Sequence, residues 1–447
     1  MLYGAALKEK GTGELLTAIK QWSIEPAWPK EFSAHCFKIS HTKKGERLTW
    51  LRVMGGQLKA KDELVAGQKA DAIRIYNGSR FATVQTVNAG NSCAVIGPTA
   101  TYPGMTIGKQ TAKQTPLVHP VIRYGIDPGD QSIDAVHSAI LQLADEDPSI
   151  EVDWDKYSQQ LHVALVGTVQ REILQQRLAE EFHLKVNFDA GQIVYAETIT
   201  QTVEGVGHFE PLRHYAEVHL LLEPGPRGSG IQLANRCRVE DLPKNWQHQI
   251  ITALSAKDHR GILIGAPLTD VKITLLGGRG SIVHSVGGDF RQATWRAVRQ
   301  GLMELGHDGC QLLEPWYRFH LTVDTSQLGH AITDISQMGG EMDDPQNGPN
   351  GQSELTGSAP VSAMFDYAAK LRSYTHGQGQ LELVVAGNRP CHNAAAIIKA
   401  THYQPKADLA NTPDSVFCAH GAGYPVDWDQ VPGQMHVPYY SNVMKKG

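Results

Sequence analysis

The hydrophobic pattern changes period several times along the 447 residues. Over residues 12–22 apolar side chains recur at helical spacing, with Leu15 and Ile19 on one face. Pro26 and Pro29 follow and interrupt any regular element. Residues 1–28 therefore predict a short strand end, one helix and the start of a linker.

Residues 29–113 contain short runs of β-branched and aromatic residues, such as RLTWLRVMGG, DAIRIYNG and NSCAVIG. Glycine, asparagine, lysine and proline separate these runs. Many short strands divided by turn residues are typical of a small β-barrel. We therefore predict a barrel for this segment.

Three further segments, 114–199, 200–310 and 311–388, contain both strand-like and helix-like spacing of apolar residues. Strand-like runs such as QLHVALVG alternate with helical runs such as SIDAVHSAILQLADED. Strand–helix–strand units of this size are typical of split α/β and ferredoxin-like modules. The last segment, 389–447, predicts one alanine-rich helix followed by a stretch without clear period. The predicted fold class is therefore multidomain α/β and β, a small β-barrel followed by three α/β modules.

Composition narrows the class of protein further. The six cysteines are scattered without a close pair, and no signal peptide precedes them, which favours a reducing, cytoplasmic location. No apolar run approaches the roughly 18 residues needed to span a bilayer, so no membrane contact is expected. The net charge is −5, so any contact with RNA must use local patches rather than the whole surface.

A nucleotide site is not expected in this chain. The nearest approach to a phosphate loop is PGMTIGKQT, where Pro103 replaces the first glycine and Gln110 replaces the serine or threonine. The match also ends the predicted barrel instead of preceding a helix. The glycine-rich stretches at 224–230 and 277–280 lack the strand-to-helix context of a dinucleotide site.

Metal and catalytic sites are not expected either. Zinc sites need clustered cysteine and histidine, and the closest pairs are Cys391 with His392 and Cys418 with His420. No H-E-x-x-H and no nucleophile elbow occur. The residues by themselves therefore predict no catalytic constellation, no metal and no cofactor.

The segment 360–377 carries the most specific motif. Its residues are Pro360, Met364, Phe365, Tyr367, Leu371, Arg372, Ser373, Thr375 and Gly377, preceded by the run Leu312–Pro315. In this spacing the segment resembles the fifth domain of elongation factor G. Other stretches resemble that family in the same order, namely 29–113 its second domain, 161–188 and 193–199 its third, and 223–230 a glycine-rich turn of its fourth.

The amino terminus resembles the last strand and helix of the family's GTPase domain. The guanine-contact loop would be Gly4, Ala5, Ala6 and Leu7, which lacks the family's serine. No phosphate loop and no Asn-Lys-x-Asp accompany it. The resemblance thus implies a truncated chain that does not bind GTP, whereas the intact parent would be a GTPase that uses GTP and Mg²⁺.

Two branches of the family remain open. The run Asp289–Arg291 and the tail DSVFCAHGAGYPVDWDQV are similar to the tetracycline ribosomal-protection proteins, which dislodge the drug from the decoding region. The alternative is a translocation factor of the elongation factor G type. Two readings outside these branches are a GTPase whose nucleotide domain lies on another chain and a generic RNA-binding scaffold.

The resemblance also implies the contacts. The fourth domain would reach the decoding region through a tip formed by Ser281, Ile282, Val283, His284, Ser285, Val286, Gly287 and Gly288. Arg279 and Arg291 would flank it and contact phosphates. Met338, Gly339, Gly340 and Arg372 of the fifth domain would face RNA. The partners would be 16S and 23S rRNA and ribosomal proteins, and the chain would be monomeric.

Overall fold

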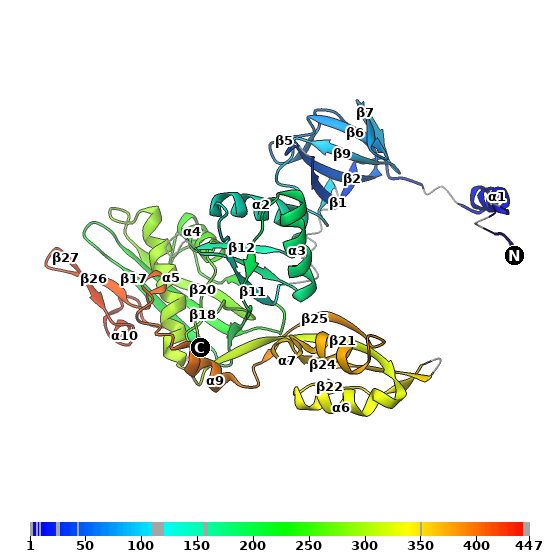
Figure 1. The fold of residues 1–447 in the computed structure, drawn as a ribbon. Helices are drawn as coiled ribbons and strands as arrows, with labels where there is room; N and C mark the ends of the chain where they lie inside the picture. Colours follow the sequence, from blue (N-terminus) through cyan, green and yellow to red (C-terminus); the bar gives the residue numbers. More distant parts are fainter. Residues whose placement is uncertain are drawn as a thin grey trace. The chain divides into compact units, whose positions relative to one another are not determined.

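The structure, a computed structural model, describes residues 3–5, 8, 10–23, 27–42, 44–108, 120–155, 160–348 and 351–440 (Figure 1). Contacts between residues divide the chain into two units. The first comprises Met1–Leu117, Asp130–Val152 and Glu181–Leu184, and the second comprises Val118–Gly129, Asp153–Glu180 and Lys185–Gly447. The predicted loop residues Ala6 and Leu7 lie outside the described residues.

The first unit is built mainly from β-strands. After helix α1 (Thr12–Trp22), a sheet has the order β10–β1–β2–β9–β6–β7. Its strands are β1 (Ser33–His41), β2 (Arg47–Gly55), β6 (Ala72–Asn77), β7 (Arg80–Val84), β9 (Ser92–Ile96) and β10 (Thr106–Gly108). Two short pairs join β3 (Gln57–Lys59) to β8 (Thr86–Asn88) and β4 (Glu63–Val65) to β5 (Gln68–Lys69). In the described part of the chain the outer strands β7 and β10 do not pair, so a closed barrel is not confirmed.

Alternate residues of these strands form the core of the sheet. Ile39, Leu51, Val53, Ile73 and Val95 are all fully buried in one apolar cluster. The period-two spacing of apolar residues, which predicted strands here, places these side chains on the same face. Burial of this face therefore stabilises the first unit.

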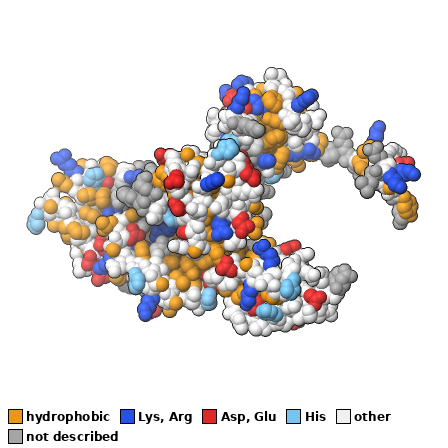
Figure 2. All heavy atoms as spheres, in the orientation of Figure 1, with side chains coloured by type: hydrophobic (Ala, Val, Ile, Leu, Met, Phe, Trp, Pro, Cys, Tyr) orange, Lys and Arg blue, Asp and Glu red, His pale blue; other side chains and the backbone are white. Residues whose placement is uncertain are grey.

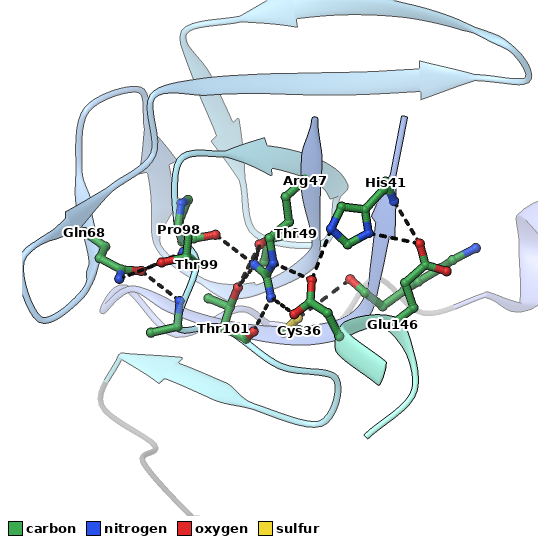
Figure 3. Close-up of polar contacts among 12 residues, drawn as sticks. Cys36, His41, Arg47, Thr49, Gln68, Pro98, Thr99, Thr101 and Glu146 are labelled. Carbon is green, nitrogen blue, oxygen red and sulfur yellow. Dashed lines mark hydrogen bonds and ion pairs between the residues drawn. The ribbon is translucent and has the colours of Figure 1, made fainter. Parts of the chain in front are cut away.

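Arg47 makes the densest polar network in this unit (Figure 3). Its Nε and Nη2 each donate to the Asp145 carboxylate at 2.7 Å. The guanidinium also donates to the carbonyl oxygens of Pro98 and Thr101 at 2.8 and 2.6 Å. Asp145 lies on helix α2 (Ile133–Glu146), and His41 of β1 hydrogen-bonds to Glu146 of the same helix. A bidentate Arg–carboxylate pair of this kind fixes geometry as well as contributing energy, so it fixes the end of α2 on the sheet.

The second unit begins with a small sheet of order β12–β13–β11–β14, with β15 also paired to β11. Its strands are β11 (Ile122–Asp127), β12 (Glu151–Asp155), β13 (Gln160–Leu165), β14 (Asn187–Phe188) and β15 (Gln192–Ile193), and helix α3 spans Thr168–Glu181. Tyr124 and Leu165 from the sheet and Leu178 from α3 are fully buried. The prediction that segment 114–199 contains both helices and strands is confirmed.

A second sheet has the order β19–β20–β18–β17–β26–β27. It contains β17 (Val203–Phe209), β18 (Ala216–Pro224), β19 (Ile231–Asn235), β20 (Val271–Gly280), β26 (Ser415–Ala419) and β27 (Ala422–Val426), with helices α4 (Lys244–Ser255) and α5 (Gly287–Leu305). One apolar cluster joins β18 and β20 to both helices. Helix α5 approaches β17 closely at Gly205 and Gly207, where an added Cβ would lie 2.1 and 2.0 Å from carbonyl oxygens of α5.

A third sheet is organised around the long strand β21 (Cys310–Asp324), which pairs with β16, β24 and β25. The remaining elements are β16 (Ala196–Ile199), η2 (Thr325–Gln327), α6 (Leu328–Gln337), β22 (Glu341–Met342), β23 (Gln346–Asn347), β24 (Gln352–Pro360), α7 (Val361–Met364), α8 (Tyr367–Tyr374) and β25 (Gln380–Pro390). Helices α6 and α8 are joined by an ion pair between Lys370 and Asp334 at 2.7 Å. Ring stacking of His330 on Tyr374, at 4.2 Å between centroids, reinforces this contact.

The tail returns to the second sheet. After α9 (Ala394–Thr401) and η4 (Leu409–Asn411), the hairpin β26–β27 joins the sheet next to β17, and α10 (Val431–Gln434) follows (Figure 1). Strand β26 pairs in parallel with β17 at Phe209 and Val416. The stretch after the alanine-rich helix, which has no clear period in the sequence, therefore contains two strands and a short helix. Among the described helices, none has the length and apolar character to cross a bilayer.

Candidate functional site

The loop between β20 and α5 is a tight, internally bonded turn. The backbone N–H of Ser285 donates to the Ser281 carbonyl at 2.8 Å, and the Ser281 N–H donates to the Ser285 hydroxyl at 2.7 Å. The Ser285 hydroxyl in turn donates to the carbonyl of Tyr215 at 2.5 Å. Ser285, which the sequence suggested as an RNA contact, is thus occupied in holding the turn.

A second loop, residues 210–215 between β17 and β18, lies beside the first. His214 Nδ1 is 2.8 Å from the Asp289 carboxylate, which also accepts the Val286 N–H at 2.9 Å. Asp289 is buried, so these bonds are shielded from water. The two loops, 210–215 and 281–286, are therefore joined, and we call them together the two-loop tip.

The tip presents apolar side chains to solvent. Ile282 is 96% exposed and Val283 is 82% exposed, while Leu212 and Val286 are more than half exposed. Two fully exposed aliphatic residues in succession on a fixed turn are unusual, because exposed large apolar groups normally occur singly.

The remaining predicted tip residues occupy different places. Gly287 and Gly288 begin helix α5 instead of extending the loop, which corrects the predicted boundary. The cause is Asp289, whose carboxylate accepts a backbone N–H at the helix start. His284 is exposed. It lines a shallow hollow together with Tyr215, Arg279, Gly280, Ser281 and His436.

The two flanking arginines are exposed. Arg279 ends β20 opposite Glu217, and Arg291 lies in the first turns of α5 with its guanidinium 5.6 Å from the Trp295 ring. The face shown in Figure 2 has cationic and anionic side chains interspersed.

The four residues predicted to face RNA from the C-terminal segment lie near two helices. Met338, Gly339 and Gly340 follow the last residue of α6, and Arg372 lies on α8. Met338 caps the end of α6, and Gly339 follows with φ 70°, a conformation that favours glycine. Gly340 packs so closely that an added Cβ would lie 2.7 Å from Ile335. Arg372 is exposed on α8, and its Nε donates to the Ala368 carbonyl at 3.3 Å. At the amino terminus, Gly4 and Ala5 are exposed, and Ala5 forms an isolated bridge with Lys10.

Behind the tip lies a buried ionic cluster that the sequence analysis missed. Glu204, His208, Glu217 and His219 are at least 94% buried in the second sheet. Glu217 lies between the two histidines, 2.7 Å from His208 Nδ1 and 3.3 Å from His219 Nε2. His219 Nδ1 is also 3.0 Å from Glu204. The signal was present, because these residues occur two or four positions apart in otherwise apolar strands.

The tail completes the cluster with backbone donors. The N–H groups of His436 and Val437 donate to Glu217 at 2.8 and 2.7 Å, and that of Tyr440 donates to Glu204 at 2.8 Å. Burial opposes ionisation of Glu217, but hydrogen bonds from the two histidines and the tail lower the pKa of its carboxyl. Burial likewise opposes protonation of His219, but its two carboxylate partners raise its pKa.

Three matches to known protein families cover most of these elements. Residues 117–190 match elongation factor G domain III, residues 191–305 match elongation factor G domain IV, and residues 311–397 match the elongation factor G C-terminus. Together they account for more than half of the chain. The chain belongs to the elongation factor G-like family, of which it carries domain III, domain IV and the C-terminal domain.

A solved structure has a similar fold. The chain is similar to a crystal structure of a protein from Thermus thermophilus, with 21% identity and a TM-score of 0.51. The match covers 88% of this chain but spans only 62% of that protein's length. At this identity the likeness shows the fold alone.

Within the elongation factor G-like family, both loops of the tip fall in domain IV, and Met338 and Arg372 fall in the C-terminal domain. The tail beyond residue 397 lies outside the family matches. It nevertheless supplies two strands to the domain IV sheet and three backbone donors to the buried cluster. The tail is thus an integral part of domain IV in this chain.

Neither of the closest cysteine–histidine pairs in the sequence belongs to a group of potential metal ligands among the described residues. Cys391 hydrogen-bonds to Asn393, and His392 pairs with Glu314 at 2.6 Å. The described residues instead bring together His208, Glu210 and His436 as a group with metal-ligating atoms.

Proposed function

We propose that this chain is the ribosome-binding portion of a translational GTPase and that the two-loop tip of domain IV is one of its contacts. The observation that supports the proposal most is the exposure of Ile282 and Val283 on a turn anchored by Ser285 and Asp289. A fixed loop loses little conformational entropy on binding. Apolar side chains presented in this way gain free energy when a partner covers them.

Local cations supply the polar part of the same contact. Arg279 and Arg291 would reach phosphates near the tip, and Arg372, which belongs to the 360–377 motif, would do so from the C-terminal domain. Large RNA is recognised mainly through shape and backbone, so a chain with net charge −5 can bind through a few arginines. The partners proposed are 16S and 23S rRNA with ribosomal proteins. Because the three matched domains do not include the GTPase domain, GTP and Mg²⁺ are proposed to act there and not in this chain.

Co-sedimentation with intact ribosomes at low and moderate salt tests this proposal. We expect the wild-type chain to bind and the double substitution Ile282→Ser with Val283→Ser to weaken binding about tenfold, because two aliphatic side chains lose their burial. The matched control is Val384→Ser, an exposed valine on β25, which should bind like wild type. Equal binding of the tip variant would remove the tip from the contact. Binding no tighter than to a generic RNA would instead favour a scaffold function.

The finer proposal is that the parent is a tetracycline ribosomal-protection protein. The run Asp289–Arg291 and the tail support it by their similarity to that branch. Asp289 and Phe290 are buried here, so they support the tip from behind and would not contact the drug. The drug-facing groups would be those of the exposed turn, Ile282 to His284.

Release of labelled tetracycline from ribosomes distinguishes the two branches. If the protection branch is correct, adding the chain in excess should accelerate drug release by at least about tenfold over buffer. Ile282→Ser with Val283→Ser should abolish this acceleration, and Val384→Ser should not. Ribosome binding without any change in drug release would favour the translocation-factor alternative.

A further inference from the structure

His208 is a fully buried imidazole with a carboxylate on each ring nitrogen. Its Nδ1 lies 2.7 Å from Glu217 and its Nε2 lies 3.0 Å from Glu210. A neutral imidazole has only one N–H to donate. If Nδ1–H donates to Glu217, the Nε2 lone pair faces the lone pairs of the Glu210 carboxylate. A cation bound between Nε2 and the Glu210 carboxylate would remove this opposition of lone pairs.

A third ligand comes from the tail. A ring nitrogen of His436, a ring nitrogen of His208 and a carboxylate oxygen of Glu210 all lie within 4.8 Å of one another. The His436 ring is held at the site, because its Nδ1 is 2.8 Å from the Tyr215 hydroxyl and its backbone N–H donates to Glu217. Ligands from β17, the tip loop and the tail thus converge on one point.

The surroundings orient the His208 ring as metal sites do. A ligating histidine usually donates its other ring N–H to a carboxylate, which fixes the tautomer and raises the basicity of the ligand. Glu217 is such a partner, and two tail N–H groups satisfy its remaining acceptor capacity. Phe417 stacks on the His208 ring, with 4.0 Å between centroids and 3° between planes, and prevents it from turning.

We propose that a divalent transition-metal ion of the zinc class binds to His208, Glu210 and His436 and fastens the tail to domain IV. Two imidazoles and one carboxylate suit Zn²⁺, and three protein ligands leave a position open for water. Nitrogen ligands favour zinc, copper or nickel over Mg²⁺ or Ca²⁺. The site is independent of the ribosome-binding proposal, because it rests on contacts within the chain alone.

The experiment uses the untagged full chain, stripped of metal by a chelator that is then removed. Zinc is titrated by calorimetry, and retained metal is measured after gel filtration. We expect one zinc per chain in wild type, and affinity reduced at least about tenfold in His436→Ala and Glu210→Gln. His284→Ala is the matched control, since His284 is an exposed histidine of the adjacent hollow but not a member of the ligand group.

Two further readouts test whether the metal binds at this site and not at a free cysteine, and whether it holds the tail. Co²⁺ bound at the site should show a spectrum without sulfur charge transfer, whereas binding at a cysteine would show it. Zinc should slow hydrogen exchange of the His436 and Val437 amides in wild type but not in Glu210→Gln. Failure of wild type to retain zinc, or equal zinc affinity in His436→Ala, would overturn the proposal.

Discussion

Replacing Glu217 with glutamine is expected to lower the free energy of unfolding by about 3–5 kcal/mol. The carboxylate is fully buried and accepts from His208, His219 and the backbone N–H groups of His436 and Val437. Glutamine keeps the size of the side chain but presents an NH₂ group where an acceptor is required. It also removes a carboxylate partner that raises the pKa of His219. Breaking a buried ionic network from one side is costly for this reason.

Chemical denaturation followed by circular dichroism measures this effect, with a chelator present so that bound metal does not contribute. The matched control is Glu223→Gln on the same strand β18. Glu223 is partly exposed and pairs with Lys272 at 3.4 Å, so its loss should cost less than about 1 kcal/mol. Similar losses in the two variants would show that the tail and the buried cluster contribute nothing specific to stability.

The local spacing of apolar residues was sufficient to predict most individual helices and strands. Helix α2 and strand β18 lie where the apolar spacing placed them, because each buries its apolar side chains in a core. The predicted end of the tip loop lay two residues too far along the chain. Gly287 and Gly288 are normally taken as helix breakers, but the Asp289 carboxylate bonds back to the Val286 N–H and starts the helix there.

The structure of the candidate site depended on contacts that no local pattern contains. Strand β26 pairs with β17 across more than two hundred residues, at Phe209 and Val416. The tail sequence has no clear period because its residues are divided between a two-stranded hairpin and single backbone contacts to buried carboxylates. Strand content in residues 29–113 was likewise predictable, whereas closure of the sheet depends on non-local pairing of its edges. The roles assigned to Arg279, Arg291, Met338 and Arg372 remain predictions.

Glu197 is a second buried carboxylate that organises backbone, in this case the loop 261–268. It is 99% buried on β16, and its oxygens accept the N–H groups of Leu263, Ile264 and Ala266 at 2.8, 2.9 and 3.0 Å. Burial raises the pKa of this carboxyl, although the three amide donors act in the opposite direction.

We therefore expect Glu197→Gln to lower the free energy of unfolding by about 3 kcal/mol, since glutamine can accept at one oxygen only and leaves a buried N–H without a partner. Hydrogen exchange gives the sharper measurement, because the amides of Leu263, Ile264 and Ala266 should exchange faster before the whole domain unfolds. Glu382→Gln is the control, as Glu382 is an exposed strand residue whose change should shift stability by less than about 0.5 kcal/mol. Unchanged exchange at the three amides in Glu197→Gln would mean that the loop is held by its apolar contacts, Leu263 and Leu268 among them, and not by the carboxylate. Faster exchange confined to those amides would show that one side chain fixes this loop, in the same way that Glu217 fixes the tail.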